Sequence, residues 1–100
     1  MNWDERAEAV LAQLCLMVPL TLRPLAETAA REESEFLAAE RSTANVNDAD
    51  VIRGWIHVTP PDQRNSLVAV IESLGFDAMS FAEDLESADE WDDENAESDA

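Results

Sequence analysis

The sequence predicts an all-α protein, a small bundle of four to five short helices followed by a disordered acidic C-terminal tail. Its 100 residues include sixteen Ala, only two Gly and no Tyr, a composition that favours helix over sheet. Apolar residues recur at helical spacing in several segments, and no segment shows sustained strand alternation. We therefore expect one helical domain over residues 2–86 and an acidic disordered tail over residues 87–100.

The first helix is expected from Trp3 to about Leu16. Asn2 and Glu5 have the spacing of a capping box, which satisfies free backbone N–H groups at a helix start. The apolar segment over residues 14–22 is interpreted as core. Acids precede it where a signal peptide carries positive charge, and it is too short to span a bilayer.

Cys15 is the only cysteine, so the chain cannot form an internal disulfide. No His or second Cys lies nearby in the sequence to activate it, and we expect a small buried side chain rather than a reactive thiol. A single cysteine in a chain with no targeting signal indicates a cytoplasmic protein.

A second helix is expected from about Thr21 to Arg41. Thr21 can cap it, and Pro24 fits its first turn, where the missing N–H costs nothing. The residues expected on its apolar face are Leu22, Leu25, Ala26, Ala29, Ala30, Phe36 and Leu37.

Cap signals also predict the remaining helices. Asn47 and Asp50 repeat the capping-box spacing ahead of a short third helix that carries Trp55. The Thr-Pro-Pro-Asp sequence at residues 59–62 predicts a fourth helix over about residues 60–74.

Gly75 and Phe76 match a left-handed cap at the end of that fourth helix, together with its usual hydrophobic contact. Ser80 and Glu83 can open a fifth, marginal helix that carries Phe81. Beyond it the chain passes into the acidic tail.

The net charge of −17 arises from 23 acids against six Arg and no Lys. Such a charge opposes contact with nucleic acid phosphates and with anionic lipids, so we expect no direct nucleic acid binding and no membrane binding. Ten of the acids lie in residues 83–100. The charge therefore points to a partner protein with a basic surface.

Trp91 is the one large apolar residue among the acids of the tail. An aromatic side chain in such a segment can anchor it to an apolar pocket, while the acids around it guide the approach. The predicted partner-binding residues are Glu90, Trp91, Asp92, Asp93 and Glu94.

Residue patterns typical of catalysis are missing from the sequence. His57 is the only histidine, and its place beside a proline turn suggests a helix-end or surface residue. The chain has no Gly-rich phosphate loop and no Cys pair at metal spacing. We therefore predict no catalytic residue, no metal ligand and no cofactor, and a protein that is not an enzyme.

The order of features over residues 3–55 resembles a known family. The residues that carry the resemblance are Trp3, Pro19, Arg23, Ala30 and Val51. They resemble the small helical domain at the C-terminus of the B subunit of the light-independent protochlorophyllide reductase. The resemblance implies a helical accessory module more than a reaction. The chain departs from the family in its acidic second helix, and residues 59–100 lie outside the match.

The leading hypothesis is a non-catalytic helical interaction or assembly module whose acidic tail docks on a basic surface of a partner protein. One alternative is an inhibitor that mimics nucleic acid toward a DNA-binding protein. Another is an accessory module of a nitrogenase-like or tetrapyrrole reductase system. A homodimer is also left open, since small bundles often gain stability by pairing.

Overall fold

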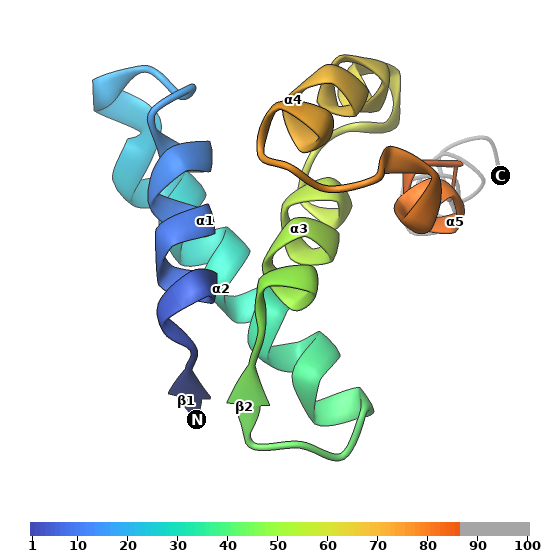
Figure 1. The fold of residues 1–100 in the computed structure, drawn as a ribbon. Helices are drawn as coiled ribbons and strands as arrows, with labels where there is room; N and C mark the ends of the chain where they lie inside the picture. Colours follow the sequence, from blue (N-terminus) through green and yellow to red (C-terminus); the bar gives the residue numbers. More distant parts are fainter. Residues whose placement is uncertain (87–100) are drawn as a thin grey trace, which may run out of the picture. The chain divides into compact units, whose positions relative to one another are not determined.

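The structure is a computed structural model that describes residues 1–86. It confirms the all-α fold: five α-helices account for most of these residues, with one pair of two-residue strands (Figure 1). In chain order the elements are β1 (Asn2–Trp3), α1 (Glu5–Cys15), η1 (Leu20–Leu22), α2 (Arg23–Glu40), β2 (Asn45–Val46), α3 (Asp48–His57), η2 (Pro61–Ser66), α4 (Leu67–Ser73), η3 (Ala78–Phe81) and α5 (Ala82–Glu86), where η marks a 3₁₀ turn.

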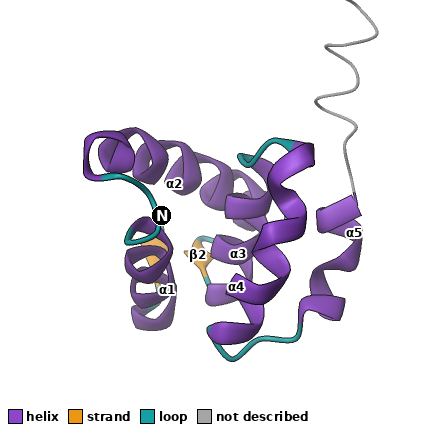
Figure 2. Cartoon of the chain, turned by 90° about the horizontal axis from the view of Figure 1, so that it is seen from above, coloured by secondary structure: helices purple, strands orange, loops and turns teal. Residues whose placement is uncertain are grey.

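The chain divides into two compact units, Met1–Val58 and Thr59–Ala100. In the first unit α1, α2 and α3 pack against one another (Figures 1 and 2). The fully buried large side chains of this unit include Leu11, Val46 and Ile56. The single domain expected over residues 2–86 stays a prediction.

The start of the first helix differs from the sequence prediction. Asn2 does not cap a helix, because its backbone belongs to β1, which runs parallel to β2. The Asn2 amide donates to the carbonyl of Ala44 at 2.8 Å, and the Asp4 amide donates to that of Val46 at 3.0 Å. Helix α1 therefore begins only at Glu5, and the capping box predicted for Asn2 is wrong.

The segment over residues 14–22 is core only at its beginning. Leu14 and Cys15 are buried, but the side chains from Leu16 onward are exposed or half-buried. Helix α1 ends at Cys15, and the chain then turns through η1 into α2. The helix-to-helix connection thus carries apolar side chains that no described element covers.

The predicted apolar face of the second helix is only partly correct. Ala30 and Leu37 are buried as expected, but Leu22, Leu25 and Phe36 are exposed. The buried positions of α2 lie on one stripe, and Leu25 and Phe36 fall on the opposite side at 100° per residue. The buried stripe consists of Ala30, Ser34, Leu37 and Ala38. Leu22, the residue before α2, makes no side-chain cap, so the cap assigned to Thr21 is also wrong.

The third helix begins as predicted. The Asn47 side chain accepts a hydrogen bond from the Asp50 amide at 2.9 Å, and the Asp50 carboxylate accepts one from the Asn47 amide at 3.0 Å. This reciprocal pair is a complete capping box. Asp50 is nonetheless buried, and its carboxylate also accepts hydrogen bonds from the Arg41 guanidinium.

In the second unit, the helix predicted over residues 60–74 is a 3₁₀ turn followed by α4. Pro61 disfavours helical backbone at the residue before it, so Pro60 is extended and the turn begins one residue later. The Thr59 carbonyl accepts a hydrogen bond from Arg64 Nε at 3.0 Å. Arg64 is buried and donates also to the Asp84 carbonyl at 3.3 Å, which joins η2 to α5.

The predicted cap after α4 is confirmed. Gly75 has a φ of 93°, and the Phe76 amide donates to the Ile71 carbonyl at 3.2 Å. These are the marks of a Schellman motif. The next turn is capped by Asp77, whose side chain accepts a hydrogen bond from the Met79 amide, rather than by Ser80.

Candidate functional site

The predicted partner-binding residues lie outside the residues that the structure describes. They are Glu90, Trp91, Asp92, Asp93 and Glu94. Their role as a docking segment stays a prediction. The described residues offer two other features that bear on function. One is an exposed apolar surface, and the other is a set of arginines that are bonded within the chain while several exposed acids make no salt bridge.

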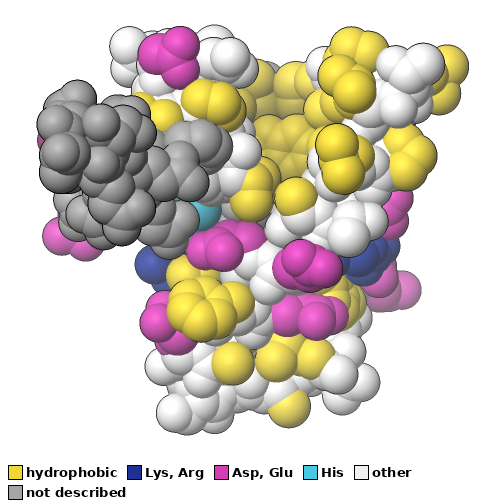
Figure 3. Space-filling model, turned by 180° about the vertical axis from the view of Figure 1, so that it is seen from behind, with side chains coloured by type: hydrophobic (Ala, Val, Ile, Leu, Met, Phe, Trp, Pro, Cys, Tyr) yellow, Lys and Arg dark blue, Asp and Glu magenta, His cyan; other side chains and the backbone are white. Residues whose placement is uncertain are grey.

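The exposed apolar surface, here called the apolar connection, joins the end of α1 to the start of α2. Its members are Leu16, Met17, Leu20, Leu22 and Leu25, whose exposed fractions are 67, 51, 74, 51 and 72%. Hydrophobic side chains gather at this end of the first unit in Figure 3. Single exposed leucines are common on proteins, but five large apolar side chains within ten residues mark a surface that is suited to binding.

Arg23 holds the apolar connection in shape. Its Nε donates to the Val18 carbonyl at 2.8 Å and its Nη2 to the Leu16 carbonyl at 3.2 Å. The guanidinium thereby gives hydrogen-bond partners to two carbonyls that follow α1. Arg23 is also the only charged residue between residues 9 and 26. The apolar connection is therefore both fixed by hydrogen bonds and poor in charge.

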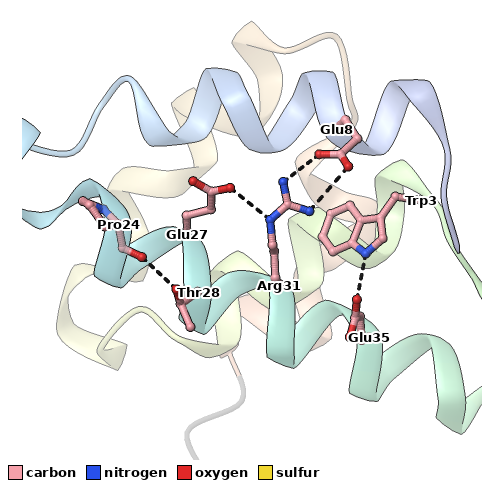
Figure 4. A network of polar contacts seen from close by, with 7 residues as sticks. All are labelled: Trp3, Glu8, Pro24, Glu27, Thr28, Arg31 and Glu35. Atoms are coloured by element: carbon pink, nitrogen blue, oxygen red, sulfur yellow. Dashed lines mark hydrogen bonds and ion pairs between the residues drawn. The ribbon is translucent and has the colours of Figure 1, made fainter. Parts of the chain in front are cut away.

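Arg31 is the centre of a polar network between α1, α2 and β1 (Figure 4). Its Nη2 lies 2.8 Å from Glu8 Oε1, and its Nε lies 3.0 Å from Glu27 Oε2. Its guanidinium carbon lies 4.6 Å from the centre of the Trp3 ring, a cation–π contact. The Trp3 indole donates to Glu35 at 2.9 Å. The hydrogen bond to Glu8, followed by the one to Glu27, raises the pKa of Arg31 above its usual value.

Two further arginines of the first unit also pair with carboxylates of the chain. Arg6 lies 3.2 Å from Asp48, and Arg41 binds both carboxylate oxygens of Asp50, which raises the pKa of Arg41. By contrast, within residues 1–58 four exposed acids make no salt bridge. They are Asp4, Glu5, Glu32 and Glu40.

His57 occupies the end of α3, as the sequence suggested. Its Nδ1 lies 2.9 Å from Glu33 Oε2, which links α3 to α2. Nearby, Ser34 of α2 is completely buried and its hydroxyl has no hydrogen-bond partner. A Cβ placed on Gly54 of α3 would lie 2.5 Å from that hydroxyl, so the two helices approach closely here. These contacts serve packing between α2 and α3.

The described residues contain no group of three or more His, Cys, Asp or Glu side chains that could hold a metal ion. Cys15 is buried, and burial, with a smaller effect of Glu27, raises the pKa of its thiol. This opposes formation of the nucleophilic thiolate. None of the helices within residues 1–86 is both long enough and apolar enough to span a bilayer.

Comparison with protein-family models, curated proteins and solved structures finds no match to this chain. The resemblance to the protochlorophyllide reductase domain is thus neither supported nor contradicted, and it stays a prediction, as does the absence of enzymatic activity. Sequence reasoning missed the apolar connection, because it assigned residues 14–22 to the core. One signal was available: residues 9–26 contain no acid in a chain with 23.

Proposed function

We propose that this chain is a non-catalytic interaction protein that binds a partner protein with a basic surface. The observation that carries the proposal is a difference between the basic and the acidic side chains of the first unit. Arg6, Arg31 and Arg41 are paired with carboxylates of the chain itself, and Arg23 is bonded to backbone carbonyls. Four exposed acids of the same unit, Asp4, Glu5, Glu32 and Glu40, make no such pair, so the surface of this unit is acidic.

An acidic surface attracts a basic partner over several ångströms and orients it before contact. The acids of residues 87–100 would add to this attraction, and Trp91 would supply an apolar anchor. Attraction of this kind weakens as salt shortens the Debye length. A cytoplasmic location is part of the same proposal.

The test is affinity capture from a lysate of the native host, with the full-length chain as bait and a rising salt gradient for elution. Two variants remove the same charge at different places. One carries Glu90→Gln, Asp92→Asn, Asp93→Asn and Glu94→Gln, and the other carries Asp4→Asn, Glu5→Gln, Glu32→Gln and Glu40→Gln. We expect one basic protein to bind the wild-type chain and to elute at lower salt from at least one variant.

Trp91→Ala separates anchoring from charge, since it leaves the net charge unchanged. It should shorten the lifetime of the complex more than it slows association. The proposal fails if both charge variants hold the same proteins as the wild type and salt does not release them. Release of the partner by added DNA would instead favour mimicry of nucleic acid.

A further inference from the structure

We infer that the apolar connection is the interface between two copies of this chain. Its five large side chains lie exposed on the first unit, and no described element covers them. This inference goes beyond the proposed function, because it uses a different surface and a different partner.

Charge identifies a second copy as the occupant. The connection lies within residues 9–26, the longest stretch of the sequence without an acid. Its one cation, Arg23, is turned onto the carbonyls of Leu16 and Val18. A basic partner therefore finds no acid in this stretch to pair with, and Arg23 already directs Nε and Nη2 toward carbonyls of the chain itself. An apolar surface without acids is complementary to another surface of the same kind.

The charge on the rest of the chain supports the same choice. Two copies that each carry a net charge of −17 repel one another. The repulsion is least where the facing surfaces carry no acids, and the apolar connection is such a place. A symmetric pair would bring the two connections together, as in an isologous dimer.

The connection is also prepared for contact. Arg23 joins it to the end of α1, and the 3₁₀ turn η1 closes with a hydrogen bond from the Leu22 amide to the Pro19 carbonyl at 2.9 Å. Little backbone order then has to be gained when two copies meet, which lowers the entropic cost of association.

This interface has a salt dependence opposite to that of a complex with a basic partner. Added salt screens the repulsion between two acidic copies and leaves apolar contact intact. Dimerisation should therefore strengthen as salt rises from about 0.05 M to about 0.5 M. Under the same change, a complex held by opposite charges should weaken.

The test is sedimentation velocity of the full-length chain from about 1 to about 100 µM, at low and at high salt. The wild type should pass from monomer to dimer within this range, at a lower concentration in high salt. Leu20→Gln should raise the dissociation constant about tenfold or more, since it removes a central apolar contact. The matched control is Met79→Gln, because Met79 is as exposed as Leu20, at 77 against 74%. This control should dimerise like the wild type.

Circular dichroism of each variant checks that both are folded. A wild-type chain that stays monomeric at both salt concentrations overturns the inference, and so does equal dimerisation of the Leu20 and Met79 variants. Failure here is distinct from failure of the proposed function. Leu20→Gln leaves every acid in place, so it should still capture the basic partner.

Discussion

The two halves of α2 differ in whether their leucine is buried. Leu37, in the C-terminal half, is buried, whereas Leu25, in the N-terminal half, is among the most exposed large apolar residues within residues 1–86. The close approach of Ser34 to Gly54 shows that α3 crosses α2 beside the C-terminal half. A leucine is buried here because a second helix lies over it, and hydrophobicity alone does not decide its place.

The strongest test of this comparison is to truncate Leu37 and Leu25 in separate variants. Leu37→Ala removes buried methyl groups and should lower the free energy of unfolding by about 3 kcal/mol. Leu25→Ala removes groups that already face solvent and should change it by less than about 0.5 kcal/mol. Urea denaturation followed by circular dichroism measures both. Equal losses would mean that the N-terminal half is covered as well.

The helix crossing itself can be tested with Gly54→Ala. In an open helix this change stabilises by about 1 kcal/mol, because glycine is a poor helix former. Here the new Cβ would lie 2.5 Å from the Ser34 hydroxyl and 3.0 Å from the Ser34 amide nitrogen. We expect a loss of about 2 kcal/mol, typical of overpacking.

Ser34→Ala is the companion variant for that test. By itself it removes a buried hydroxyl without a partner and should be neutral or slightly stabilising. Combined with Gly54→Ala it should restore part of the lost stability, since the shortest of the close contacts is gone. A stabilising Gly54→Ala in the wild-type background would contradict the close crossing.

The end of α2 offers a test of smaller size. Ser42 follows the helix with a φ of 60°, and the Thr43 amide donates to the Ala38 carbonyl at 3.2 Å. This left-handed position favours glycine. Ser42→Gly should raise the melting temperature and stabilise by about 1 kcal/mol. Gly75→Ala, at the matching position after α4, should destabilise by a similar amount, and opposite signs for the pair are the expected result.

The smallest effect concerns Cys15, which lies at the end of α1. Burial raises the pKa of its thiol in the folded chain, with Glu27 adding to the rise. Above the ordinary thiol pKa the unfolded chain releases a proton that the folded chain keeps, so stability falls as pH rises through that window. Cys15→Ala should flatten this part of the stability profile. A thiol reagent should also react more slowly with the folded chain than with the chain in urea.

The sequence predicted two helix boundaries correctly from local chemistry. The capping box of Asn47 and Asp50 and the glycine cap at Gly75 depend only on residues within a few positions. The start of α1 could not be found in this way. It depends on β1 pairing with β2, a contact between residues far apart in the chain.

The candidate surface was harder to predict for a similar reason. Leu14 and Leu16 belong to one apolar run, yet the first is buried and the second exposed. The difference arises because α1 ends between them, and no sequence pattern says which helix will cover which side chain. The salt bridge between Arg31 and Glu8 was equally hidden, since its partners lie on different helices.

The parallel pairing of β1 with β2 closes a long loop of the chain into a ring. Asn2 lies beside Asn45, and the chain between these two residues contains α1 and α2. Contacts between α2 and α3 are closer in sequence and can form earlier, whereas ring closure has to overcome the entropy of the long loop. We expect the N-terminal strand to dock last during folding. In the folded protein the amides of Asn2 and Asp4 should then exchange hydrogen early, so the ring opens first at the N-terminus.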